Sequence, residues 1–466
     1  MVTVTQSGFD GTRLLTAYWI TLLVVPAPMV IGALGQVGGP STLIALTCAL
    51  AWGWEQINRS EPAPTLPNMV RNAALVFLAA ILVSYVNSAL LPLPGDERSP
   101  ADGALLKMVG AVGVVCLLCE GIRSMNQLWK LVERIVLGMG AVSALAMFQM
   151  ATGEVWVDRI SVPGLSAAEG LSVIQRGAIT RPSGTATHPI EFAAFLAIGM
   201  PFALAVAARA RHHSWLYRTI AVLVPLQLLL VGSRTAIVCG AVAFLVMLAA
   251  WRGRTRLLAL GGSVVMMAVL FVAMPGLVGT IRGLFEGASG DPSVKSRTNS
   301  YVIVGEFWSH HPWFGRGVGT FLPKYWILDN QYLNLLMGAG LVGVVGLLAL
   351  VAVASAAAGR SARVFDDAHD RVLAVAALAA IVAGAVSLAL FDAFSFPQAA
   401  GLFFMSIGIS GCLQRLSRLQ YVKSLTAQPG EPARALIGLT STMPPNVVGN
   451  TIPRLGKGRR SEWCAR

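Results

Sequence analysis

Apolar stretches of about 20 residues recur along nearly the whole chain. Their apolar positions are continuous rather than alternating, so each stretch predicts a membrane-spanning helix and excludes a strand of a membrane barrel. The sequence therefore predicts an all-α fold, a polytopic transmembrane helical bundle. Twelve spans are expected, over residues 14–35, 41–54, 72–92, 103–120, 131–151, 188–208, 215–232, 236–251, 257–278, 330–356, 372–391 and 396–414.

The spans divide the chain into three parts. Residues 1–13 form a short N-terminus, 14–414 the transmembrane domain, and 415–466 a basic, Pro-rich tail that is expected to be disordered. The first apolar run lacks a small-residue cleavage site and is too long for a signal peptide, so we expect it to remain as a span.

Two connections are long, over residues 152–187 and 279–329. In the second, which precedes the tenth span, one face of residues 293–309 carries Arg297, Tyr301, Val304 and Trp308. This spacing predicts an amphipathic helix lying along the membrane surface. The alternative is an ordinary interfacial helix whose arginine extends to lipid headgroups.

Basic residues give the orientation. With the N-terminus inside, the short cytoplasmic connections carry fourteen of them, whereas the short outer connections carry only Arg98 and Arg234. This asymmetry places both termini in the cytoplasm and both long loops outside. The fourteen are Arg59, Arg71, Arg123, Lys130, Arg134, Arg209, Arg211, Arg218, Arg252, Arg254, Arg256, Arg360, Arg363 and Arg371.

Composition agrees with a membrane protein. Only 12% of residues are charged, about half the usual fraction in soluble domains, and the mean hydropathy is +0.67. The net charge of +13 does not indicate nucleic-acid binding, because the charges cluster in short loops between spans. Five cysteines lie in apolar runs and Cys464 lies in the tail, so no disulfide framework is expected. The six histidines lack metal-ligand spacing, and a Walker A sequence is absent.

Asp329 and Asn330 stand where a long polar loop meets the apolar run that continues to about Ala358. An ionisable group at such a boundary is a functional-site hypothesis. The alternative is a helix N-cap, because Asp and Asn are both favoured there.

Arginines gather in the predicted outer connections, against the orientation rule. They are Arg176, Arg181, Arg234 and Arg297. Arginine binds phosphate groups bidentately, so a polyanionic ligand is one explanation. Pairing with acids such as Glu191, Glu306 or Asp329 is the other. His188 and Glu191, at the start of the sixth span, are the nearest rival bases to Asp329, although a single histidine there is more often structural.

Several short motifs together resemble the O-antigen ligase and O-antigen polymerase superfamily. Asp329-Asn330 is followed, after nine residues, by Gly340-Leu341-Val342-Gly343, where the family begins its motif with His. The other matching stretches are the Ser233–Ala236 turn, the approach from Arg181 to Pro189, and Trp313–Gly319. The resemblance covers most of residues 14–414.

The resemblance implies a metal-independent glycosyltransferase, without cofactors, in the inner membrane of a bacterium. The donor would be a glycan on undecaprenyl pyrophosphate, and the acceptor a glycan or glycolipid hydroxyl at the outer face. Arg181, Arg234 and Arg297 would hold the pyrophosphate, and Asp329 would act as the base. Both ligation and polymerisation stay open, because Asp replaces the family's His.

Two other classes of protein share some of these sequence features. A polysaccharide exporter or lipid-linked oligosaccharide flippase would also need about twelve helices and outer arginines. Such transporters commonly have paired halves or broken helices, and the sequence predicts neither. A scaffold within a cell-envelope complex is the third class.

Overall fold

The structure is a computed structural model that describes residues 10–58, 67–154, 157, 160, 162–167, 174–176, 179–273 and 292–426. Within these ranges, side chains are described except at 33, 35, 36, 167, 174–176, 179–180, 273, 292–298 and 423–426. The predicted tail beyond 426, most of the predicted N-terminus and parts of both long loops therefore lie outside the described residues. The chain divides into two units, Met1–Arg418 and Leu419–Arg466.

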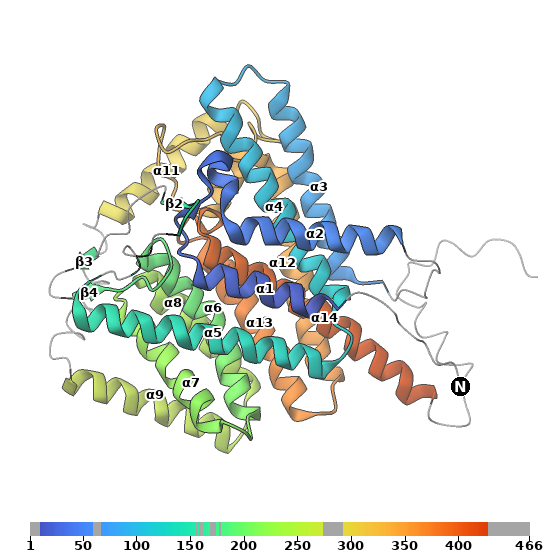
Figure 1. Cartoon of the computed structure of the whole chain (residues 1–466), viewed down its shortest axis with the longest axis vertical. Coiled ribbons are helices and arrows are strands. Elements are labelled where there is room, and N and C mark those ends of the chain that lie inside the picture. The colour runs from blue at the N-terminus through green and yellow to red at the C-terminus, as the bar shows by residue number, and fades with distance from the viewer. Residues whose placement is uncertain are drawn as a thin grey trace, which may run out of the picture. The chain divides into compact units, whose positions relative to one another are not determined.

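Each of the twelve predicted segments contains a helix, and a further helix, α11, lies in the second long loop (Figure 1). Within the described residues, eight helices are long and apolar enough to cross a membrane, and α7 and α8 are shorter apolar helices. The chain is thus an all-α, multi-pass membrane protein. The helices are α1 (Gly11–Val24), α2 (Pro40–Ile57), α3 (Met69–Ala89), α4 (Gly95–Gly121), α5 (Met125–Thr152), α6 (Pro189–Arg209), α7 (Ser214–Leu230), α8 (Arg234–Ala250), α9 (Arg254–Ala273), α11 (Pro292–Trp308), α12 (Gln331–Val364), α13 (Ala368–Leu388) and α14 (Pro397–Thr426).

The first helix is shorter than the predicted span. α1 ends at Val24, because Pro26 has no N–H and disfavours helical geometry in the residue before it. The chain continues through the strand β1 (Met29–Val30) and the 3₁₀ helix η1 (Gly32–Gly38). β1 pairs antiparallel with β2 (Ser166–Ala167), so the first long loop is fastened beside the end of α1. A second hairpin joins β3 (Ile174–Arg176) to β4 (Ile179–Arg181).

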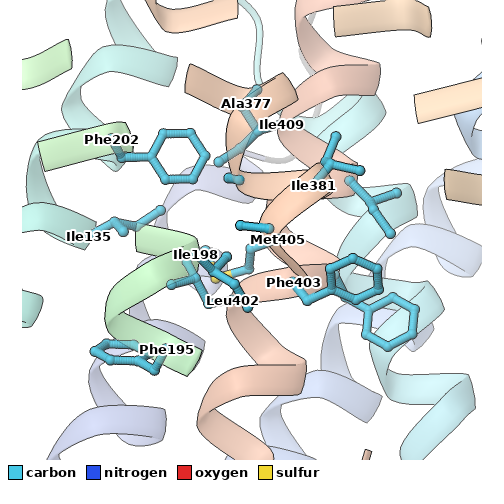
Figure 2. Packing of buried hydrophobic residues seen from close by; sticks show 14 of the residues in the cluster. Ile135, Phe195, Ile198, Phe202, Ala377, Ile381, Leu402, Phe403, Met405 and Ile409 are labelled. Carbon is cyan, nitrogen blue, oxygen red and sulfur yellow. The ribbon is translucent and has the colours of Figure 1, made fainter. Parts of the chain in front are cut away.

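The core of the first unit lies around α6, which packs against α7, α8 and α13. Of the most apolar 18 residues of α6, 83% are buried, whereas the corresponding figure for α9 is 6%. α6 is therefore central, and α9 lies at the margin of the bundle (Figure 1). Figure 2 shows the buried side chains that α5, α6, α13 and α14 contribute to the core, among them Ile135, Phe195, Ile198, Phe202, Ile381, Leu402, Phe403 and Met405.

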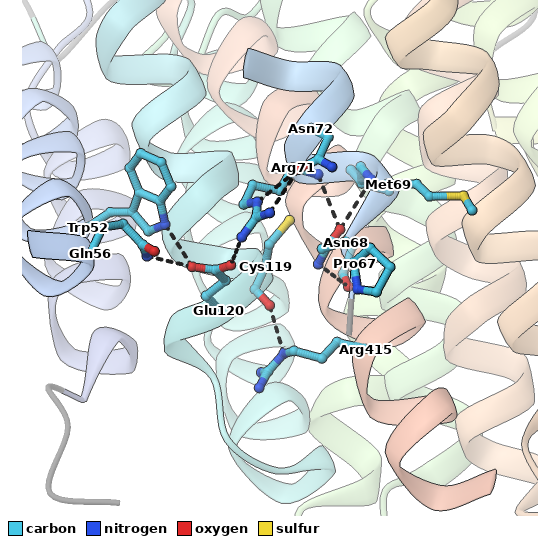
Figure 3. A network of polar contacts seen from close by, with 12 residues as sticks. Trp52, Gln56, Pro67, Asn68, Met69, Arg71, Asn72, Cys119, Glu120 and Arg415 are labelled. Atoms are coloured by element: carbon cyan, nitrogen blue, oxygen red, sulfur yellow. Dashed lines mark hydrogen bonds and ion pairs between the residues drawn. The ribbon is translucent and has the colours of Figure 1, made fainter. Parts of the chain in front are cut away.

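At the end of the bundle where α4 stops, a polar network joins α2, α3, α4 and α14 (Figure 3). The Glu120 carboxylate accepts hydrogen bonds from Trp52 Nε1 at 3.0 Å and Gln56 Nε2 at 2.7 Å, and forms an ion pair with Arg71. Arg415 Nε donates to the Cys119 carbonyl at 2.9 Å. The carbonyls at the end of α4 and the buried acid beside them thus have partners, as a low-dielectric setting requires.

α12 is broken near its beginning. Gly340 has φ 64° and ψ −164°, a combination that is essentially restricted to glycine. A Cβ at this position would lie 2.4 Å from the carbonyl carbon and oxygen of Trp313. The sequence predicted no broken helix, and that expectation was wrong, because an apolar run containing glycines is equally consistent with a continuous helix.

The segment 312–317 fills the break. The backbone N–H groups of Arg316 and Gly317 donate to the carbonyls of Met337 and Gly338, at 3.0 and 2.8 Å. In return, the N–H groups of Leu341 and Val342 donate to the carbonyls of Pro312 and Trp313, at 2.9 and 3.1 Å. Backbone groups released by the break are therefore paired inside the protein, which a membrane environment demands.

Two side chains of α3 complete this arrangement. Ser84 Oγ donates to the Gly338 carbonyl at 2.7 Å, and Asn87 Nδ2 donates to the Gly315 carbonyl at 3.0 Å. Gly315 itself has φ 66°, and a Cβ there would lie 2.3 Å from the Gly338 oxygen. The Trp313–Gly319 stretch and the glycines of α12 thus pack against each other and form one structural unit.

We predict that Gly340→Ala lowers stability by about 3 kcal/mol, because the Cβ is forced into a glycine-only conformation and against Trp313. Gly359→Ala, on the same helix, is the control: no atom lies within 4 Å of its Cβ position, and alanine favours the helix. Thermal denaturation of the purified protein in detergent measures both. Equal denaturation midpoints for the two variants would contradict the role given to the break.

Candidate functional site

α6, α12 and α14 begin at one end of the bundle, which we call the site end. The backbone N–H of Gln398 donates to the Glu191 carboxylate at 2.7 Å and joins the starts of α6 and α14. The N–H of Phe394 donates to Gln331 Oε1 at 2.8 Å and joins α12 to the turn before α14. Most of the residues singled out from the sequence lie at this end.

Asn330, rather than Asp329, caps α12. The Asn330 side-chain oxygen accepts from the N–H groups of Tyr332 and Leu333, at 3.0 and 3.2 Å. Within the described part of the chain, the Asp329 carboxylate forms no hydrogen bond or ion pair. The capping explanation therefore applies to Asn330, and the partly exposed carboxylate of Asp329 is not used to start the helix.

A second carboxylate, Asp392, lies near Asp329 in the turn between α13 and α14. Asn334 Nδ2 donates to Asp392 Oδ1 at 3.2 Å, and Ser395 Oγ donates to Oδ2 at 2.5 Å. Burial raises the pKa of Asp392 to about 6, and the negative charge of Asp329 contributes to the rise. The two hydrogen bonds that Asp392 accepts and the positive charge of Lys107 act in the opposite direction. Two neighbouring carboxylates, one of which titrates near neutrality, are suited to proton transfer.

The start of α8 lies beside the first long loop. Arg181 is buried, and its Nε donates to the carbonyl of Val231 at 2.9 Å, in the tight turn that leads to Arg234. Arg234, which the sequence placed in the turn before the eighth span, is the first residue of α8, and its side chain is partly exposed. The side chain of Arg181 thus contacts the backbone of the turn that leads to Arg234, and both arginines are predicted to bind phosphate.

His188 and Glu191 have structural roles at the start of α6. His188 is the N-cap, and its Nδ1 accepts from the N–H of Ile190 at 3.1 Å. Burial and the positive charge of Arg181 lower the pKa of His188 to about 4, so the ring is neutral and can accept. Glu191 is fully buried, and its oxygens accept from the N–H groups of Thr187 and Gln398, at 2.8 and 2.7 Å.

The predicted helix is present as α11, and the predicted face is buried only in part. Val304 is 3% exposed and packs with Leu328 and Met337, whereas Tyr301 is 60% exposed. Ser300 accepts from Trp326 Nε1 at 3.0 Å and belongs to the buried face. The side chains of Arg297 and Arg176, on α11 and β3, lie outside the described residues, so their roles stay predictions.

A buried ion pair holds the loop before α12 to α4. Glu97 is fully buried, and its carboxylate accepts from Arg316 Nη2 and from the Tyr325 hydroxyl, both at 2.5 Å. Removing one partner from such a pair typically costs several kcal/mol. Arg316 therefore fixes the segment that fills the break in α12, both through its backbone and through its side chain.

Residues 219–348 match the family model described as O-Antigen ligase. These residues form an O-antigen ligase-like domain. The match runs from α7 into α12 and includes Arg234, Arg297, Asp329 and Gly340, whereas Arg181 and Asp392 lie outside it. Among curated proteins, none matches the chain. Within the described residues, no group of three or more His, Cys, Asp or Glu side chains gathers as a metal site would.

Several charged residues that lie outside residues 219–348, and that the fold places beside the O-antigen ligase-like domain, were not predicted from the sequence. Asp392 follows a predicted span by one residue, so its position at a boundary was a usable signal, the same one that singled out Asp329. Lys107 lay inside a predicted span, where a basic residue is also unusual. Glu97 gave no signal, because its burial arises only from packing against the loop that contains Arg316 and Tyr325.

We predict that Asn330→Ala destabilises the protein by about 1 kcal/mol, because two N–H groups at the start of α12 lose their acceptor. Asp329→Ala, one residue earlier, should change stability by less than about half of that amount. Thermal denaturation in detergent measures both. A larger loss in Asp329→Ala than in Asn330→Ala would show that the aspartate, not the asparagine, supports the helix.

Proposed function

We propose that the protein is a membrane glycosyltransferase of the O-antigen ligase or polymerase type, acting in cell-surface polysaccharide biosynthesis. It would transfer or polymerise undecaprenyl-pyrophosphate-linked oligosaccharide onto a glycan or lipid acceptor at the extracytoplasmic face. The observation that carries the proposal is Asp329, which stands where the resembling family has His, does not cap its helix and lies near Asp392.

The proposed reaction is a displacement at the anomeric carbon of the donor sugar. The acceptor oxygen forms a bond to this carbon while the bond to the pyrophosphate oxygen breaks, and the acceptor proton passes to Asp329. Negative charge grows on the departing pyrophosphate, and Arg181 and Arg234 would stabilise it through preorganised guanidinium groups. Arg297 is proposed as a third contact, on the basis of the family resemblance.

Asp392 would support Asp329 in accepting the proton. Burial and the negative charge of Asp329 disfavour the ionised form of Asp392, so Asp392 holds a proton more readily than an exposed carboxylate does. Asn334 and Ser395 orient Asp392 by hydrogen bonds to its two oxygens. A carboxylate that titrates at about 6 beside the proposed base suits proton transfer near neutral pH.

The placement of charge supports an extracytoplasmic site. Arg71 at the start of α3, Arg209 at the end of α6 and Arg252 after α8 all lie at helix ends opposite to the site end. Basic residues in short connections favour the cytoplasm. The site end would then face outside, with both termini in the cytoplasm of a bacterial inner membrane.

One observation favours the alternative of an exporter or flippase. α12 is broken, as in transporters that bind substrate at exposed backbone groups. Here, however, four backbone hydrogen bonds to residues 312–317 occupy the groups at the break. The break thus stabilises the protein's own loop, which supports a transferase over a transporter.

We predict that Arg234→Lys and Asp329→Asn each lower glycan transfer by roughly a hundredfold, because one loses a bidentate anion contact and the other loses the base. The assay follows glycan transfer from a purified lipid-linked donor in reconstituted vesicles. Arg252→Lys, an exposed arginine after α8, is the matched control and should transfer normally.

Three results would contradict this assignment. Wild-type transfer rates in both site variants would remove Arg234 and Asp329 from the mechanism. Donor that crosses the bilayer without any change in its glycan would favour the flippase. Loss of transfer on treatment with a chelator would contradict the metal-independent reaction.

We further predict an acid limb near pH 6 in the profile of kcat/KM. Asp392 can accept a proton only in its ionised form. Because the pKa of Asp392 is raised to about 6, the ionised form is lost as pH falls through about 6. Asp392→Asn should lower transfer and remove this limb, whereas Asp366→Asn, at the opposite end of the bundle, should leave it in place. An unchanged limb in Asp392→Asn would show that another group titrates.

A further inference from the structure

A lateral groove lies between α1 and α5. Its volume is about 570 Å³, within the range of ligand-binding pockets. The walls are almost entirely apolar apart from the Trp19 indole nitrogen, with Thr185 at one end of the groove and Arg134 and Thr16 at the other. Arg134 Nη1 donates to Thr16 Oγ1 at 2.7 Å and closes that end. The shape and lining suit an elongated apolar chain.

One polar group in the wall has no protein partner. Trp19 lines the groove and is 1% exposed, and its Nε1 lacks a hydrogen-bond acceptor within the described part of the chain. This nitrogen abuts Gly138, which also lines the groove, because a Cβ at Gly138 would lie 2.6 Å from it. A buried indole N–H usually finds a partner. The π electrons of an unsaturated chain are a weak acceptor for such a group.

The groove leads to the loop that carries Arg181. Gln149, near the end of α5, holds Gly184 through two hydrogen bonds of 2.9 Å, one to its carbonyl and one from its N–H. The next residue, Thr185, lines the groove. An apolar chain in the groove therefore emerges within a few residues of a buried guanidinium group.

The length of the groove selects the occupant. The α5 residues that line the groove, from Arg134 to Leu145, span roughly 17 Å, and Thr185 extends the lining beyond them toward the site end. The acyl chain of a phospholipid in one leaflet reaches about 15 Å, half of the hydrocarbon core. A chain that fills the groove from the site end to Arg134 must therefore pass the midplane, which a long polyprenyl chain can do.

We propose that this groove binds the polyprenyl chain of the lipid-linked donor, with the pyrophosphate directed toward Arg181. The proposal rests on the proposed glycosyltransferase function and assigns the donor's apolar part to a defined surface. Chain length and unsaturation then contribute to donor selection, independently of the sugar.

Photolabelling of the full-length protein tests binding without transfer. The probe is a long polyprenyl pyrophosphate with a photoreactive group on its chain and no sugar. Labelled peptides should come from α1 and α5, around Leu137–Leu145. Ala141→Trp fills the groove from an exposed position and should reduce this labelling roughly tenfold. Ala79→Trp, exposed on α3, is the matched control and should label normally.

Labelling confined to other helices would overturn the proposal. It would also be overturned if saturated phospholipid displaced the groove labelling as effectively as polyprenyl pyrophosphate does. Because the wild-type result is decisive by itself, the test holds even if Ala141→Trp fails to fold.

Donor chain length supplies the second measurement. Ala141→Trp should raise KM roughly tenfold for a long-chain donor and leave kcat near the wild-type value. With a donor of about two isoprene units, too short to fill the groove, wild type and variant should have equal KM. The same rise in KM for both donors would contradict binding in the groove. Absence of transfer in wild type, with labelling of the groove intact, would instead contradict the proposed function alone.

Discussion

The break in α12 at Gly340 is the constraint on which this end of the protein depends. A membrane-spanning helix that opens its backbone must find partners within the protein, because lipid supplies none. Residues 312–317 provide them through four backbone hydrogen bonds, and Ser84 and Asn87 add side-chain contacts. This loop is thereby fixed against α12, and the first turns of α12 become a short helical segment with its own anchors.

Those anchors place the candidate catalytic groups. Asn330 caps the segment, Gln331 holds the turn before α14, and the Tyr332 hydroxyl donates to the Ala385 carbonyl at 2.9 Å. With three successive residues engaged, Asp329 has a defined place opposite the turn that carries Asp392. Glu191 likewise holds the neighbouring loop, because it accepts from Thr187 in the approach to α6 and from Gln398 at the start of α14.

The acids of the bundle divide by their partners. Glu97 and Glu120 pair with arginines, which balance their charge, and Glu191 accepts hydrogen bonds from backbone N–H groups. Asp329 and Asp392 instead lie near each other. Asp392 is also near the positive charge of Lys107 and accepts a hydrogen bond from Asn334. Burial and the negative charge of Asp329 raise the pKa of Asp392 to about 6, and a carboxylate perturbed in this way is typical of sites that perform chemistry.

The sequence by itself determined the helices, the boundary position of Asp329 and the tight turn before Arg234, because each depends on residues adjacent in the chain. Hydrophobic length sets a span locally, since every helix satisfies its own backbone. The break at Gly340, the exposure of Tyr301 beside the buried Val304, and the approach of Asp392 to Asp329 were decided only by tertiary packing. Each joins segments that are distant along the chain, and a local pattern does not specify which distant groups meet.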